Sequence, residues 1–245
     1  MKILKNRAFT LAEVIITLGI IGVVAAMTIP TLIQKYQEKE MVSRWFKAYS
    51  MLQQVIKLAE ADCGNSSTWT WENFLDTDKT DIDVTGSAYA CMKPYLKVVS
   101  DCPKGGADCF LTGSRSYSYL DKSNVLGICN YYGPAVKLIS GETICFHNGE
   151  RENLVVDLNG TAPPNRIGID VHYFSLVDTS TGQSLVPGLG GKWSDRGDSA
   201  EGCNMEFAQW RKNGDSCGFW IQRHKNMKYL HMTKAQVQKA WNSYK

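Results

Sequence analysis

A run of twenty residues without a charge, from Val14 to Ile33, limits what this 245-residue chain can be. A helix rises about 1.5 Å per residue, so a helix over this run would be about 30 Å long, which is the thickness of a bilayer's hydrocarbon core. We therefore expect this helix to be able to span a membrane. One carboxylate, Glu13, lies at the start of the run, where a charged group near hydrocarbon is costly unless it has a partner.

A basic leader precedes the run, with cations at positions 2, 5 and 7. An ordinary secretory signal would be cut after the apolar core, and the small residues around Ala25 and Ala26 could form that cleavage site. A cut between Ala8 and Phe9 would instead create a new α-amine four residues before Glu13. If subunits pack side by side with an axial offset, Glu13 of one subunit can neutralise the Phe9 amine of its neighbour and so fix the register between them.

The segment RAFTLAEVIITLGIIGVVAAMTIPTLI resembles the N-terminus of the type IV pilin and type II secretion pseudopilin superfamily. Members share a short basic leader, a cut before Phe, a Glu at mature position five and a long apolar helix. The resemblance implies a leader over residues 1–8, a cut between Ala8 and Phe9, and methylation of the new amine. It assigns the subunit register to Glu13 and a helix kink to Pro30. The family usually has Gly before the cut, so Ala8 predicts slower processing.

The same resemblance implies a function in assembly. It predicts a structural subunit of a type IV pilus-like filament or a type II secretion pseudopilus, with no enzymatic activity and no required cofactor. The implied partners are prepilin peptidase, an inner-membrane assembly platform and identical or related pilin subunits. The protein would lie in the inner membrane as a precursor and then in a periplasmic or extracellular filament. The alternatives are a monomeric exported enzyme or binding protein with an ordinary cleaved signal, and a DNA-uptake minor pilin.

The apolar spacing changes after Ile33 from a continuous run to a helical period with a polar opposite face. We expect one helix over residues 9–62, of which 9–33 forms the transmembrane or filament-core part, ending near Cys63-Gly64-Asn65. Its periodic apolar positions are Tyr36, Met41, Trp45, Tyr49, Leu52, Ile56 and Ala59.

Residues 63–245 are expected to form one globular pilin-like head, which makes the fold class α+β with an antiparallel sheet. AVKLIS and GETICF predict a hairpin around Ser140-Gly141, and NLVVDLNG and IGIDVHYFSLVD predict two further strands. We also expect a short strand in CGFWIQR. The polar, Gly-rich region 63–134 is expected to be a long loop region that cysteines hold in place.

Eight cysteines follow the apolar run and include no C-x-x-C pair, which disfavours a zinc ribbon or a thioredoxin-type site. An exported chain would oxidise them, so we expect up to four disulfides from loops of the head. The sequence leaves their pairing open. The candidates are Cys63, Cys91, Cys102, Cys109, Cys129, Cys145, Cys203 and Cys217.

Oxygen donors flank a turn that contains Gly160 and the pair Pro163-Pro164 in VDLNGTAPPNRIGIDVHYF, and calcium is the cofactor they could hold. The candidate metal ligands are Asp157, Asn159 and Asp170. The spacing is not that of a twelve-residue calcium loop. The alternative is a hydrogen-bonded turn in which Asp157 and Asn159 cap backbone groups and Asn165 tightens the return.

The end of the chain, from Ser216 to Lys245, has six Lys or Arg residues, two His and no Asp or Glu, interleaved with aromatic residues. Such a segment could contact a polyanion such as nucleic acid through Lys228, Lys234 and Lys239. The alternative is a helix that begins with a capping box of Thr233 and Gln236. Its apolar face would then pack through Val237, Trp241 and Tyr244.

Enzyme motifs are absent from the sequence: it contains no H-E-x-x-H, no G-x-S-x-G and no G-x-x-x-x-G-K-[ST]. The four histidines do not cluster with a cysteine at metal-ligand spacing. We therefore expect no catalytic residues.

Overall fold

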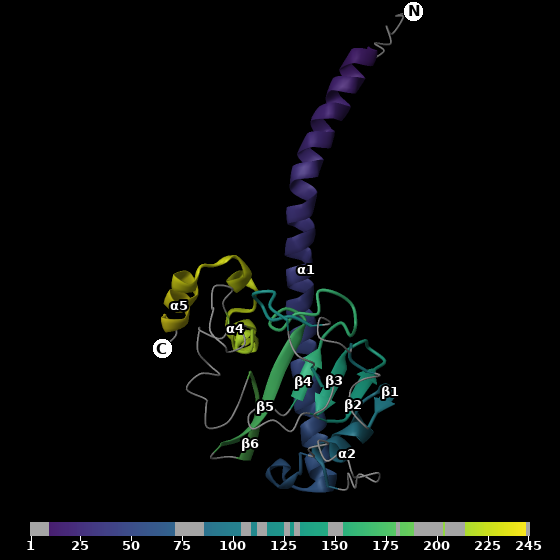
Figure 1. Ribbon diagram of the computed structural model, residues 1–245, viewed down its shortest axis with the longest axis vertical. Coiled ribbons are helices and arrows are strands. Elements are labelled where there is room, and N and C mark those ends of the chain that lie inside the picture. The colour runs from purple at the N-terminus through teal and green to yellow at the C-terminus, as the bar shows by residue number, and fades with distance from the viewer. Residues whose placement is uncertain are drawn as a thin grey trace, which may run out of the picture. The chain divides into compact units, whose positions relative to one another are not determined.

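The computed structural model describes residues 10–71, 86–103, 109–111, 117–124, 128–129, 133–146, 154–179, 182–188, 203 and 214–243 (Figure 1). The chain divides into two compact units, Met1–Glu40 and Met41–Lys245. The structure confirms the expected α+β class, with a long N-terminal helix, an antiparallel sheet and disulfide-pinned loops.

Helix α1 runs from Leu11 to Cys63 and supplies the described part of the first unit. Its most apolar 18-residue window has a mean hydropathy of 2.2 and no buried residue, so the helix is long and apolar enough to cross a membrane. The hydroxyls of Thr17, Thr28 and Thr31 donate to backbone carbonyls three or four residues earlier, which pairs these polar groups inside the helix. Pro30 lies within α1, and the kink assigned to it stays a prediction.

In the second unit, α1 packs one face into the main hydrophobic core. The buried positions repeat every three or four residues, which is the period of a helix that covers a sheet. The same core includes Ile144, Val156 and Phe174 from the strands. The buried residues of α1 are Trp45, Ala48, Leu52, Val55, Ile56 and Ala59.

Polar contacts join this part of α1 to the sheet. Lys47 Nζ lies 2.8 Å from a carboxylate oxygen of Glu142, which is only 2% exposed, so the ammonium pairs a buried charge. The Tyr49 hydroxyl donates to the carbonyl of Leu185 at 3.1 Å. These bonds fix the rotation of α1 against the strands beyond what apolar packing requires.

The sheet has six antiparallel strands whose spatial order follows the chain, β1 to β6. Alternate residues therefore face opposite sides, with Ile144 in the core beneath α1 and Cys145 in a second, smaller core on the other face. The strands are β1 (Val98–Cys102), β2 (Ala135–Leu138), β3 (Thr143–Phe146), β4 (Leu154–Asp157), β5 (Val171–Thr179) and β6 (Gly182–Pro187).

Short helices complete the second unit. Two of them, η1 (Ser66–Thr68) and α2 (Ala88–Met92), follow α1 in the chain, and η2 (Lys93–Tyr95) leads into β1. The C-terminal part contains α4 (Cys217–His224), η5 (Lys228–His231) and α5 (Lys234–Asn242).

The strand expected in CGFWIQR is wrong, because Cys217–His224 forms helix α4. Cys217, Trp220 and Ile221 are buried at helical spacing, and the disulfide from Cys217 to Cys203 holds the start of the helix. Strands β1 and β6 were not predicted. The expected hairpin and the strands at β4 and β5 are confirmed.

Gly214 lies where the segment before α4 crosses the loop that precedes β5. Its φ is +117°, and a Cβ built on it would lie 2.3 Å from the carbonyl oxygen of Ile167. We expect Gly214→Ala to lower the free energy of unfolding because the crossing backbones must separate. Gly64→Ala is the matched control, since Gly64 also has a positive φ of +76° but open space around it.

Overpacking of this kind costs about 1–3 kcal/mol. Urea unfolding of the full-length protein in detergent should therefore show Gly214→Ala to be less stable than Gly64→Ala by about that amount. Equal destabilisation in the two variants would mean that the two backbone segments at Gly214 and Ile167 can move apart without a loss of stability.

Candidate functional site

The N-terminus of α1 places Glu13 in a capping box with Thr10. The amide and the hydroxyl of Thr10 each donate to Glu13 Oε2 at 2.8 Å, and the Glu13 amide donates to Thr10 Oγ1 at 3.3 Å. The carboxylate thus has a partner within its own chain, which the sequence analysis missed. The T-x-x-E spacing from Thr10 to Glu13 was the available signal.

The geometry leaves room for a second partner on Glu13. The two hydrogen bonds from Thr10 to the Glu13 carboxylate both end on Oε2. A carboxylate has about four acceptor sites, so an α-amine of a neighbouring chain could still bind to this one. Ala8 and Phe9 lie outside the described residues. The cut between them, the methylated amine and the register role of Glu13 therefore stay predictions.

Apolar side chains stay exposed along the first part of α1. Between Leu11 and Ile33 they include thirteen large residues that are each more than 40% exposed. A surface of this size in contact with water would be unfavourable, so it requires lipid or protein around it. These residues are Leu11, Val14, Ile15, Ile16, Leu18, Ile20, Ile21, Val23, Val24, Met27, Ile29, Leu32 and Ile33.

Two of the three proposed metal ligands are fully buried carboxyl groups. Asp157, at the end of β4, accepts from the Tyr117 hydroxyl at 3.0 Å and from the Asn159 amide at 3.3 Å. Asp170 accepts from the amides of Asn165 and Arg166, both at 2.7 Å. The structure therefore brings the loop 157–170 together through donors to carboxylates, as the turn alternative expects.

Burial and mutual repulsion change the acidity of this pair. Burial, and next the nearby Asp170 charge, raise the pKa of Asp157 to about 8. Burial also raises the pKa of Asp170, although the Arg166 and Asn165 amides act against it. Asp157 therefore holds a proton at neutral pH and acts as a neutral group.

This proton gives a pH dependence of stability. The pKa of Asp157 is higher in the folded state than in the unfolded state, so its contribution is complete below about pH 4 and is lost as the pH rises towards 8. Between pH 6.5 and 8 we expect stability to fall with a slope of at most about 1.4 kcal/mol per pH unit. Asp157→Asn, measured by thermal unfolding in EDTA, should flatten that slope.

A second buried group acts in the opposite direction at the start of this window. Burial lowers the pKa of His172 to about 4, whereas the unfolded state still binds a proton at about pH 6.5, so His172 makes stability rise with pH up to about pH 7.5 and is neutral in both states above that. A slope that persists unchanged in Asp157→Asn would assign the pH dependence to other groups.

No group of three or more His, Cys, Asp or Glu side chains in the described part of the chain is placed to hold a metal ion. Buried side-chain oxygens of Asn159 and Asn165 do lack hydrogen-bond partners. Because they belong to the same loop as the two carboxyl groups, the donor set is one that a hard cation accepts. Calcium binding here stays a prediction.

The C-terminal end contains the predicted capped helix. In α5 the Gln236 amide donates to Thr233 Oγ1 at 3.3 Å, and the Thr233 amide donates to Gln236 Oε1 at 2.8 Å. Val237 and Trp241 are buried, which confirms the packed face, while Tyr244 lies outside the described residues. Lys228, Lys234 and Lys239 are exposed, and their contact with a polyanion stays a prediction.

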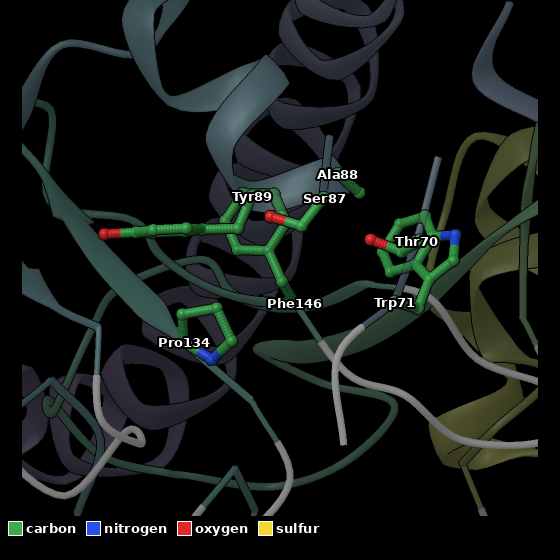
Figure 2. A pocket seen from close by; sticks show the side chains of 7 residues that line it. All are labelled: Thr70, Trp71, Ser87, Ala88, Tyr89, Pro134 and Phe146. Atoms are coloured by element: carbon green, nitrogen blue, oxygen red, sulfur yellow. The ribbon is translucent and has the colours of Figure 1, made fainter. Parts of the chain in front are cut away.

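A small pocket lies beside α2 (Figure 2). Tyr89 lines it with its ring, while the Tyr89 hydroxyl donates to Asp101, which also accepts from Lys93. Among the seven lining residues there is no carboxylate, amine or imidazole, so the pocket offers no acid–base pair. The lining consists of Thr70, Trp71, Ser87, Ala88, Tyr89, Pro134 and Phe146.

Comparison with known proteins gives two matches. Residues 31–184 match a family of unknown function, DUF6613, and residues 3–29 match the prokaryotic N-terminal methylation motif. No curated protein and no solved structure matches the chain. The second match covers most of the leader, Glu13 and the apolar run as far as Ile29, so it agrees with the resemblance that these residues carry.

Proposed function

Since the chain belongs to the DUF6613 family and begins with the prokaryotic N-terminal methylation motif, we propose that it is a structural subunit of a type IV pilus-like filament or a type II secretion pseudopilus. The motif supports a pilin-like exported protein. The filament role is our proposal, and it is one of assembly with no catalytic step.

The observation that carries the proposal is the exposed apolar part of α1 with Glu13 capped at its start. A membrane can cover this surface in the precursor, and a bundle of identical helices can cover it in a filament. Lipid tails are as apolar as these side chains, so van der Waals packing and polar pairing must favour the filament over the membrane. Glu13 is the polar group in this segment that can make such a pair.

In this proposal, prepilin peptidase cuts the precursor between Ala8 and Phe9 in the inner membrane, and the new amine is methylated. The assembly platform then moves the subunit into a filament in the periplasm or outside the cell. Glu13 of each subunit neutralises the Phe9 amine of a neighbour. Four disulfides are consistent with a head that lies in an oxidising compartment.

Electron microscopy of native cells tests the filament role. Gold-labelled antibodies against residues 41–245 should mark filaments that are missing when the gene is deleted. Label confined to the cell membrane, with no filament in wild-type cells, would contradict the proposal.

Calcium in the loop 157–170 is a separate proposal. Asp157, Asn159 and Asp170 would supply the oxygens, supported by the unpartnered amide oxygens of this loop. A bound ion stabilises the folded state by mass action, so we expect calcium to raise the melting temperature and EDTA to lower it. Asp170→Asn should lose the response, and magnesium is the matched control ion. Equal melting temperatures in calcium and EDTA would leave the hydrogen-bonded turn as the complete description.

A further inference from the structure

The C-terminal elements of the second unit present a surface of one charge. Helices α4, η5 and α5 surround a common aromatic core, in which the ring of Trp220 lies 6.4 Å from that of Trp241 and 5.9 Å from that of Tyr229. Five exposed cations lie around this core, and no Asp or Glu occurs from 216 to 243. We call this set the basic surface: Arg223, Lys225, Lys228, Lys234 and Lys239.

The aromatic core limits what the basic surface can recognise. Trp220, Tyr229 and Trp241 are at most 3% exposed, so these rings offer no platform on which bases could stack. Four of the five cations are lysines, which act as point charges and recognise an anionic partner without a fixed geometry. The surface therefore fits an acidic peptide at least as well as a nucleic acid.

The chain itself contains an acidic peptide of suitable charge. Residues 72–85 hold five acidic residues and one lysine, a net charge of −4, and no stretch of that length outside this region is as negative. We call residues 72–85 the acidic segment. Its acidic residues are Glu72, Asp76, Asp78, Asp81 and Asp83.

The residues that flank the acidic segment are described, and they lie together. The Thr70 amide donates to the Gly86 carbonyl at 3.2 Å, and the Ala88 amide donates to the Thr70 carbonyl at 2.9 Å. The described residues on both sides of the segment therefore lie at the pocket beside α2 (Figure 2).

Within the second unit, α2 lies towards one end and α4 and α5 lie towards the other (Figure 1). The described residues that flank the acidic segment and the basic surface thus lie on different parts of the same unit. A contact between two different patches is heterologous, and repeated contacts of this kind generate an open filament where the rotation between copies does not close into a ring.

We propose that the acidic segment of one copy docks on the basic surface of the next copy along the filament. This inference rests on the proposed function, because it describes how neighbouring heads recognise each other in the same assembly. The contact pairs acidic residues with exposed cations, so it sets orientation and rate of association and weakens with salt.

Charge reversal on each side tests the contact in living cells. Lys225→Asp, Lys228→Glu and Lys239→Glu in one chain should together reduce filament yield about tenfold or more. Aspartate is chosen at 225 because Lys225 has a φ of +54°, which Asp tolerates better than most residues. Reversal of the acidic segment by Asp76→Lys, Asp78→Lys and Asp81→Lys should cause the same loss.

Co-expression of the two reversed chains separates a contact between copies from one within a copy. The positive segment of one chain then meets the negative surface of the other, so mixed filaments should form although neither chain forms them alone. The matched control reverses three exposed lysines elsewhere in the second unit, Lys57, Lys97 and Lys122, and should leave the yield unchanged.

Normal yield from the reversed basic surface would overturn the inference, and so would a loss that co-expression does not rescue. Duplex DNA binding at physiological salt that is lost in the reversed basic surface, without rescue of filaments, would assign the surface to nucleic acid. Absence of filaments from the wild-type chain would contradict the proposed function and not this contact alone.

Discussion

Replacing Glu13 by alanine is expected to leave the protein in the membrane but to abolish its incorporation into filaments. Insertion depends on the apolar residues that follow, which the change does not touch. Assembly depends on a carboxylate that can neutralise the amine of a neighbouring subunit, and alanine removes that charge. Cell fractionation followed by a count of sheared filaments measures the two outcomes separately.

Two further variants separate the charge of Glu13 from its capping role. Glu13→Gln keeps an acceptor for the Thr10 amide and hydroxyl but has no charge, whereas Thr10→Ala loses the Thr10 hydroxyl and keeps the charge. If neutralisation between subunits matters most, Gln should fail like Ala, and Thr10→Ala should still assemble. Normal filament yield from Glu13→Gln would reduce the role of Glu13 to helix capping.

Reduction of the four disulfides is expected to unfold much of the second unit. Loss of one native disulfide costs about 2–5 kcal/mol in small secreted domains, and the whole stability of a domain is about 5–15 kcal/mol. The bonds join Cys63 to Cys91, Cys102 to Cys109, Cys129 to Cys145 and Cys203 to Cys217. Circular dichroism melting with and without reductant, in detergent, measures the loss.

The four disulfides should also differ in how much each one stabilises the folded state. The loop closed by Cys63 and Cys91 spans 28 residues and that closed by Cys102 and Cys109 spans 7, so the chain-entropy model predicts that the first contributes about 1 kcal/mol more. Paired Cys→Ala variants test this difference. A thiol assay that finds eight free cysteines in the mature protein would contradict both the stabilisation and the exported location.

Much of the fold could be predicted because its elements follow local rules. The end of α1 at Cys63 is one residue from the expected stop, and four of the six strands were found from alternation and turn residues. The capping box at Thr233 was read from the sequence, yet the equivalent one at Thr10 was not, although the same rule applies.

Other elements depend on contacts that no local pattern contains. Strand β1 pairs with β2 across more than thirty residues of chain, so its pairing is non-local. In α4 the residues Phe219, Trp220 and Ile221 favour a strand by propensity. The packing of Trp220 against Trp241 and the close approach of Gly218 to Pro187 override that preference. The hydrogen bonds around Asp157 and Asp170 likewise follow from the fold of the loop and not from its composition.

The intact mass of the mature protein, purified from its native membrane or filaments, tests the central claim most directly. The account predicts a chain that begins at Phe9, lacks residues 1–8 and carries one added methyl group on its α-amine. A chain that has lost about 26 residues would identify an ordinary secretory signal. Either that mass or an uncut precursor within filaments would contradict processing at Phe9 and, with it, the assembly role of Glu13.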